Sequence, residues 1–113
     1  TYRQIKTCIL NNIDEYGWKY SEDEHFAPIY LESNNFMIES LMKVYKDQTG
    51  DTESKPIIIG GGTYARAMEN AVAFGPVFPN EEELAHKANE YISIDKLLKL
   101  TEIYSEAIRQ LCQ

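Results

Sequence analysis

Three stretches of the chain place apolar residues at helical spacing, and each is bounded by a residue that suits a helix end. The first stretch, residues 3–16, stops at Gly17, which tolerates the left-handed backbone of a helix terminus. The last stretch follows Ser93, a good N-cap, and its apolar stripe runs from Leu97 to Leu111. The pattern predicts a C-terminal helix that packs along its whole length.

The remaining helical stretch lies in the middle of the chain. Ser33 or Asn34 can cap its start, and Gly50 can end it. Between them an amphipathic pattern runs from Phe36 to Gln48, so a second helix is expected here.

Short apolar runs between the second and third helices predict strands. Residues 57–59 are three isoleucines without alternation, which is typical of a strand that is covered on both faces. A glycine-rich loop at 60–63, a short helix at 64–69 and a second apolar run at 71–74 follow. A brief alternation at 18–20 adds a third candidate strand. Because helices alternate with buried strands, the expected fold class is α/β.

Size and charge narrow the function classes. The chain has 113 residues, about the size of one small domain, and a formal net charge of −7. This charge repels polyanions and argues against nucleic acid as a partner. The longest apolar runs are far shorter than the roughly 20 residues that a membrane-spanning helix needs, so no membrane partner is expected.

The cysteines bear on the cellular location of the protein, and the first residue bears on whether the chain is part of a longer one. Cys8 and Cys112 lie near opposite ends of the chain without metal-type spacing, and we expect reduced, buried thiols. These features favour a cytoplasmic protein. The start at Thr1, without an initiator Met, leads us to expect a segment of a longer protein.

The glycine-rich loop is the first place where chemistry could sit. Without a Cβ, Gly60, Gly61 and Gly62 let main-chain N–H groups approach an anion or an oxyanion, and Thr63 adds a hydroxyl. The run lacks the spacing of a dinucleotide-binding fingerprint and the ending of a phosphate loop, so a tight structural turn explains it equally well. Arg66 could offer a cation to a carboxylate, although a surface or ion-pair role is commoner.

His86 is the second candidate, because it lies in a polar segment that follows the two predicted strands. A histidine on a loop beside the end of a sheet can be a metal ligand or a base, whereas residue type alone favours an ordinary solvated histidine. His25 has no such context and is interpreted as solvated. The acidic run at 81–83 is interpreted as a solvated face, and Glu90 as a residue that caps or orients a loop.

At these residues the sequence resembles a known family. The segments GGGTYARAM (60–68), NAVAFGP (70–76) and EELAHKANEYI (82–92) are similar, in order and separation, to the C-terminal end of bacterial Xaa-His dipeptidases, also called dipeptidase V. These enzymes belong to the zinc aminoacylase, carnosinase and glutamate carboxypeptidase superfamily. The resemblance is close over residues 28–113 and loose over residues 1–27.

The resemblance implies a cytosolic metallodipeptidase with two metal ions, usually zinc, with manganese or cobalt as alternatives. Such an enzyme hydrolyses dipeptides of the Xaa-His type, with broad specificity, by metal-activated water. The resemblance implies that His86 is a ligand of one zinc ion. It also implies that the substrate pocket is lined by Gly61, Gly62 and Thr63. It assigns no substrate contact to Arg66.

The resemblance further implies how the chain is divided. Residues 1–27 correspond to the last helix and strand of an α+β lid domain. Residues 28–113 correspond to the C-terminal segment of a mixed-sheet catalytic domain with helices packed on the sheet. Glu69 stands where relatives commonly carry proline, which is a small departure.

A larger departure concerns the metal ligands and the general base. The His-x-Asp motif, the bridging aspartate and the Glu-Glu pair with the base lie upstream in relatives and have no counterpart in this sequence. One ligand cannot hold two zinc ions. The chain alone is therefore predicted to be inactive and to contain no catalytic residue.

Two other hypotheses stay open. A stand-alone binding or assembly module could keep the glycine loop to grip an anionic ligand without catalysis. Separation from a parent protein could instead leave apolar faces exposed, so that the chain self-associates.

Overall fold

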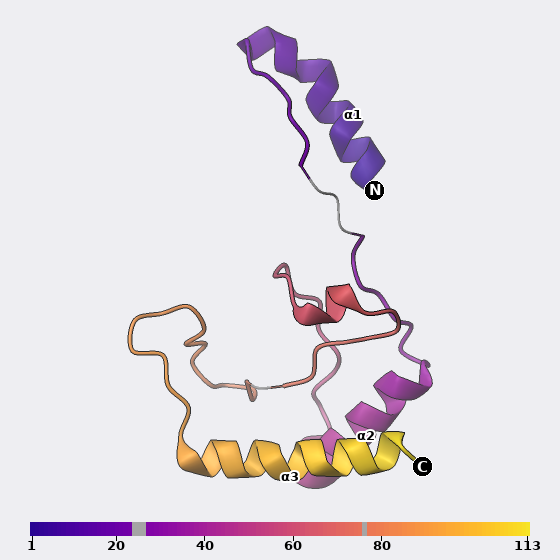
Figure 1. Cartoon of the computed structure of the whole chain (residues 1–113), viewed down its shortest axis with the longest axis vertical. Coiled ribbons are helices and arrows are strands. Elements are labelled where there is room, and N and C mark those ends of the chain that lie inside the picture. Colours follow the sequence, from indigo (N-terminus) through magenta and orange to yellow (C-terminus); the bar gives the residue numbers. More distant parts are fainter. Residues whose placement is uncertain (24–26, 76) are drawn as a thin grey trace.

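The computed structural model describes residues 1–23, 27–75 and 77–113 (Figure 1). Within them, three α-helices and two short 3-10 helices follow one another along the chain. Their bounds are α1 Tyr2–Asn12, η1 Ile13–Tyr16, α2 Phe36–Thr49, η2 Tyr64–Ala67 and α3 Ile94–Leu111. The three predicted helices are confirmed, and η2 replaces the short helix expected at 64–69. His25 lies outside the described residues, as does Pro76, where a loop was expected.

Local sequence explains where the helices begin and end. Gly17 ends η1 and Gly50 ends α2 in left-handed backbone, with φ of 65° and 74°, as the sequence predicts. Asn35 caps α2, one residue after the later of the two predicted caps. The Ser93 hydroxyl caps α3 by accepting the Lys96 N–H at 3.2 Å.

The chain leaves α2 through a turn built on Asp51. Its carboxylate accepts hydrogen bonds from the Ser54 hydroxyl at 2.5 Å and from the Tyr45 hydroxyl at 2.8 Å. The same carboxylate accepts the main-chain N–H groups of Glu53 and Ser54, each at 3.0 Å. These bonds, first that of the Ser54 hydroxyl, hold the pKa of Asp51 well below its usual range. The turn precedes the segment that carries the isoleucine run.

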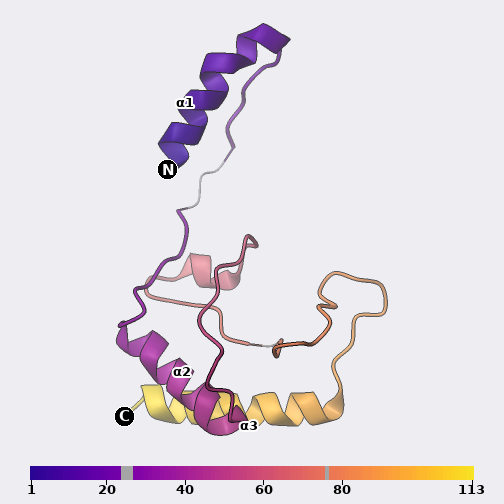
Figure 2. The ribbon, with the colours of Figure 1, turned by 180° about the vertical axis from the view of Figure 1, so that it is seen from behind.

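The core lies where α2 and α3 cross (Figures 1 and 2). Its buried side chains come from both helices, and a loop between η2 and α3 covers them. The buried members are Leu41, Val44, Ile103 and Ala107, and the partly buried members packed on them are Met37, Val72, Phe74, Phe78, Tyr104 and Leu111. The loop is thus anchored to the helix pair by apolar contacts.

α3 buries only one of its sides. Leu100 and Ile103 are buried, whereas Leu97, Leu98 and Ile108 are 52%, 60% and 64% exposed. The prediction that this helix packs along its whole length is therefore wrong for its first turn and for Ile108, whereas the core includes Ile103 and Ala107. α2 has 14 residues against 18 in α3 and crosses it, so it covers only part of the longer helix.

No strand occurs in the part of the chain that the structure describes, so the sheet of the expected α/β fold is not seen there. Ile57 and Ile58 are 83% and 91% exposed, although their pattern predicts burial on both faces. The expected strands at 71–74 and 18–20 are likewise irregular chain. A strand needs hydrogen-bonded neighbours, and a doubly covered strand also needs a layer on each face. The described residues supply neither.

α1 stands away from the α2–α3 pair (Figures 1 and 2). It packs against η1, and none of its residues is buried. Cys8 on α1 and Cys112 after α3 are free and exposed, so the prediction of buried thiols is wrong. Cys8 is exposed because no other helix covers α1, and Cys112 because it lies beyond the last turn of α3.

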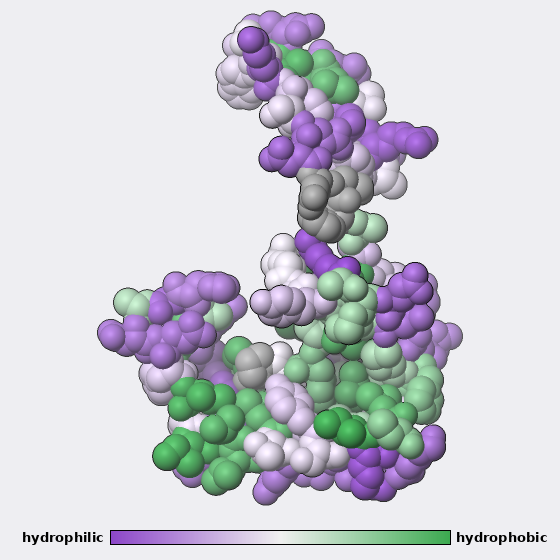
Figure 3. Space-filling model, in the orientation of Figure 1, coloured by the Kyte–Doolittle hydropathy of each residue, from purple (hydrophilic) through white to green (hydrophobic). Residues whose placement is uncertain are grey.

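The chain as a whole is extended. Its radius of gyration is 18.9 Å, against about 13 Å for a compact domain of about 100 residues. Figure 3 shows apolar side chains gathered on the open surface of the part that holds the core. Among the described helices, none combines the length and the hydrophobicity needed to cross a bilayer.

Candidate functional site

The glycine-rich loop connects the isoleucine run to η2 and stands in the open (Figure 1). None of its three glycines has a positive φ, so the backbone conformation does not require glycine here. A Cβ added at Gly60 or Gly61 would meet no atom within 4 Å. A Cβ at Gly62 would lie 3.6 Å from Nη1 of Arg66. The glycines therefore leave the main chain of this loop exposed.

Thr63 begins η2 and brings Arg66 back beside the loop. It has extended backbone, with φ of −130° and ψ of 164°, and its carbonyl accepts the Arg66 N–H at 3.1 Å. Its hydroxyl makes no capping hydrogen bond to η2, so it remains open to another partner. The loop therefore presents main-chain N–H groups and a hydroxyl next to an exposed guanidinium.

His86 lies on a tight turn with its side chain exposed. The turn is closed by a hydrogen bond from the Lys87 N–H to the Leu84 carbonyl at 3.0 Å. His86 occupies its third position in left-handed backbone, with φ of 63°. The Glu90 carboxylate accepts the main-chain N–H of His86 at 3.2 Å. A residue other than glycine in left-handed backbone costs about 1 kcal/mol or more, so the surrounding contacts must stabilise His86 in this conformation.

The acidic run before this turn is exposed, as predicted, and two of its carboxylates make ion pairs. Glu81 pairs with Lys96 of α3 and accepts the Phe78 N–H at 2.9 Å. These two hydrogen bonds, first that of Lys96, lower the pKa of Glu81. Glu82 pairs with Lys87 at 3.3 Å. The run thus ties its loop to α3 and to the turn of His86.

The described residues do not combine these features into one centre. Figures 1 and 2 show the glycine loop and the segment around residues 84–90 as separate loops. No group of three or more His, Cys, Asp or Glu residues that could hold a metal ion occurs in residues 1–23, 27–75 and 77–113. The exposed imidazole of His86 suits a metal as one donor, but these residues do not complete a site.

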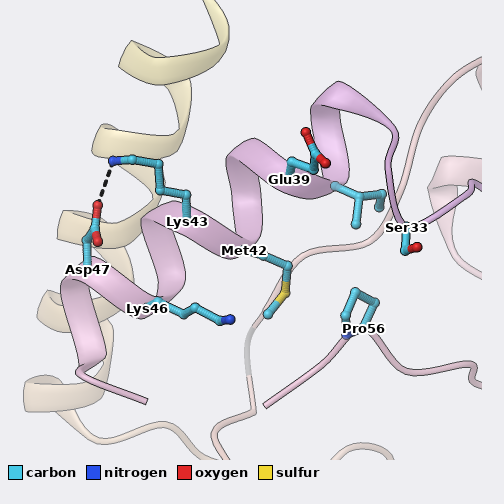
Figure 4. A pocket seen from close by; sticks show the side chains of 8 residues that line it. Ser33, Glu39, Met42, Lys43, Lys46, Asp47 and Pro56 are labelled. Atoms are coloured by element: carbon cyan, nitrogen blue, oxygen red, sulfur yellow. Dashed lines mark hydrogen bonds and ion pairs between the residues drawn. The ribbon is translucent and has the colours of Figure 1, made fainter. Parts of the chain in front are cut away.

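A shallow hollow of about 380 Å³ lies between α2 and Pro56 (Figure 4). Met42 and Lys46 help to line it. They are four residues apart, a spacing that places two side chains on one face of a helix and that the sequence already shows. Lys43 at its edge pairs with Asp47 at 2.7 Å. The residues that line it include neither histidine nor cysteine, and no nucleophile with an adjacent base.

Comparison with known proteins identifies the relatives of this chain. It is 41% identical over 102 residues to a protein of Staphylococcus aureus (strain USA300) that is a dipeptidase by name, covering 90% of this chain and 22% of that protein. A protein of Staphylococcus saprophyticus, also a dipeptidase by name, is 37% identical over 111 residues, covering 98% of this chain and 24% of that protein. The chain thus spans about a quarter or less of the length of these relatives.

The comparison with solved structures and the comparison with family models differ in outcome. No solved structure matches the chain. The model of peptidase family M20/M25/M40 matches residues 10–110, which is most of the sequence. The chain therefore belongs to peptidase family M20/M25/M40.

Proposed function

We propose that this chain is the C-terminal segment of a metal-dependent dipeptidase, a hydrolase that cleaves the peptide bond of dipeptides with water. The observation that carries the proposal is the family match over residues 10–110, with relatives that are dipeptidases by name and about four times longer. The preferred substrates are of the Xaa-His type with broad specificity. The proposed location is the cytoplasm, and the net charge of −7 argues against nucleic acid as a partner.

The proposed domain division places residues 1–27 at the end of a lid domain and residues 28–113 in the catalytic domain. The packing supports this division, because α1 contacts η1 and neither of the other α-helices. The expected mixed sheet of the catalytic domain then forms only when further strands are supplied by the rest of the protein. The 83% and 91% exposure of Ile57 and Ile58 supports this part of the proposal.

In this proposal His86 supplies one ligand of a two-metal centre, usually zinc, with manganese or cobalt as alternatives. Its exposed imidazole on a tight turn fits such a ligand in chemistry and access. When bound, the metal ions supply Lewis acidity to the reaction. The other ligands and the general base come from outside this chain, so the chain alone is inactive.

The same proposal gives the glycine loop the role of holding the substrate. A Cβ at Gly61 would stand in open space and one at Gly62 would contact only the Arg66 guanidinium, so the main chain of a dipeptide can approach closely. The Thr63 hydroxyl makes no capping bond to η2 and can donate to the substrate backbone or its carboxylate. Because none of these glycines has a positive φ, the backbone conformation does not itself require glycine, which agrees with a role in close approach of the substrate.

The experiment that tests the function uses the full-length protein that contains this chain. We expect the purified protein to hydrolyse dipeptides, to lose activity on chelation, and to regain it with zinc. His86→Ala is expected to abolish the metal-dependent turnover while the melting temperature of the metal-free protein stays the same. Lys87→Ala, which changes the next residue of the same turn, is the control. Full activity in His86→Ala would refute the proposed ligand.

The isolated chain is proposed to self-associate, because the apolar faces that the sheet and the lid would cover are open. Leu97, Leu98 and Ile108 on α3 are all more than half exposed, as is the isoleucine run. Light scattering over a range of concentrations is expected to give a mass that rises with concentration. A constant monomer mass would contradict this expectation.

A further inference from the structure

The turn that carries His86 is followed by a second bend that returns toward it. Asn89 has left-handed backbone, with φ of 59°, like His86 itself. The two bends bring Glu90 back to the first, where its carboxylate accepts the His86 N–H at 3.2 Å. Glu90 therefore links the end of the loop to the backbone of the residue whose imidazole is exposed.

Other contacts of this loop restrain His86 less directly. The hydrogen bond from Lys87 to Leu84 closes the turn but does not involve a His86 atom. The ion pair of Lys87 with Glu82 is exposed at both ends, and such pairs contribute roughly 0–1 kcal/mol. The hydrogen bond from the His86 N–H to Glu90 is exposed as well, but its acceptor is a carboxylate and it holds a main-chain atom of His86. It also acts on the strained residue itself.

Holding the backbone N–H of His86 has a consequence for its side chain. The direction of the Cα–Cβ bond follows from the backbone conformation, so a left-handed residue points its side chain differently from one in extended backbone. If the turn relaxed to a commoner conformation, the imidazole would point elsewhere. The carboxylate of Glu90 opposes that relaxation.

We propose that Glu90 is a positioning residue for His86: its carboxylate holds the main-chain N–H of His86 and thereby fixes the direction in which the imidazole is presented. This inference rests on the proposed function, in which that imidazole is a metal ligand. Glu90 itself touches neither metal nor substrate. It acts through the backbone of the loop.

The test compares three variants of the full-length protein that contains this chain. Glu90→Ala removes the acceptor, and Glu90→Gln keeps an acceptor oxygen on a side chain of nearly the same shape. Glu83→Ala is the matched control, because Glu83 is exposed and makes no hydrogen bond or ion pair within the described residues. Zinc affinity is measured by competition with a chelator, and the melting temperature is measured on the metal-free protein.

We expect Glu90→Ala to bind zinc about 10–100-fold more weakly, which is the usual effect of losing a group that orients a ligand. Glu90→Gln is expected to recover most of this loss, because its amide oxygen still accepts the N–H. Glu83→Ala is expected to bind zinc normally, and all metal-free variants to melt alike. Zinc affinity in Glu90→Ala equal to that of Glu83→Ala would overturn the inference. Equal losses in Glu90→Gln and Glu90→Ala would also overturn it.

His86→Ala separates this inference from the proposed function. If His86→Ala binds zinc as tightly as the unchanged protein, the proposed ligand role fails, and the inference about Glu90 fails with it. If His86→Ala loses zinc while Glu90→Ala matches the Glu83→Ala control, the proposed function stands and only the role of Glu90 is refuted.

Discussion

Gly75 lies in the loop that crosses the helix pair, and its replacement by alanine is expected to be strongly destabilising. Gly75 has left-handed backbone with φ of 84°. A Cβ there would overlap the hydroxyl of Tyr104 and lie 3.1 Å from its Cζ. The Tyr104 hydroxyl donates to the Phe74 carbonyl at 3.2 Å, and the two rings meet edge to face with centroids 6.0 Å apart. The new methyl group would therefore displace the side chain that anchors this loop to α3.

The expected cost follows from three separate losses. Left-handed backbone at alanine costs about 1–2 kcal/mol relative to glycine. Loss of the hydrogen bond from Tyr104 to Phe74 costs about 1 kcal/mol, and loss of the edge-to-face ring contact about 0.5–1.5 kcal/mol. Together they lower the free energy of unfolding by about 3 kcal/mol, which is large for a single change on a loop.

Urea unfolding followed by far-UV circular dichroism measures this cost, and two further variants separate its parts. Gly50 also has left-handed backbone, with φ of 74°, but an added Cβ there meets nothing within 4 Å. Gly50→Ala is thus expected to show the backbone cost alone, about 1–2 kcal/mol. In a Tyr104→Phe background the hydroxyl is absent, so Gly75→Ala is expected to cost about 1 kcal/mol less than in the unchanged chain. Equal costs for Gly75→Ala and Gly50→Ala would refute the proposed collision with Tyr104.

Three further predictions concern the isoleucine run, the Asp51 turn and the cysteines. Ile58→Ala is expected to change the free energy of unfolding of the isolated chain by less than about 0.5 kcal/mol, but to lower that of the full-length protein by about 2–5 kcal/mol. Ile103→Ala is expected to lower the free energy of unfolding by about 2–5 kcal/mol in both proteins. Hydrogen bonds to the Asp51 carboxylate, first that of the Ser54 hydroxyl, lower the folded-state pKa of Asp51. These bonds therefore stabilise the folded chain above about pH 4, and their contribution is lost as the pH falls toward the folded-state pKa of Asp51. Acid is expected to lower the midpoint of urea unfolding less in Asp51→Asn than in the unchanged chain. Cys8 and Cys112 are expected to react with a thiol reagent in the folded chain about as fast as in urea, and protection of either would contradict its exposure.

The helices could be predicted from sequence because their ends are decided locally. Gly17 and Gly50 adopt the left-handed conformation that few other residues accept, and Ser93 offers a hydroxyl to the first turn of α3. Each of these signals involves residues within four positions of the helix end. The cap of α2 was predicted one or two residues early because Ser33, Asn34 and Asn35 are all suitable, and the pattern does not choose among them.

The surroundings of His86 could be predicted only in part. The polar context of His86 indicated an exposed loop, and the structure places it on one. Its left-handed backbone and its hydrogen bond to Glu90 depend on two successive bends, which no spacing rule reveals. The glycine run was equally compatible with a tight turn or an approach surface, and the sequence alone does not reveal that its backbone avoids positive φ.

The isoleucine run shows why the predicted sheet and the structure of this chain differ. Burial of each isoleucine side chain is worth about 1.5–3 kcal/mol, so an uninterrupted apolar run is kept where a protein covers both faces of a strand. In this chain Ile57, Ile58 and Ile59 are 83%, 91% and 55% exposed, and no neighbouring strand is described. The pattern therefore corresponds to surroundings that the described residues do not contain. Under the proposed function, the sequence carries the pattern of a whole catalytic domain, and within the described residues only α2, α3 and the loop that covers them form a packed core.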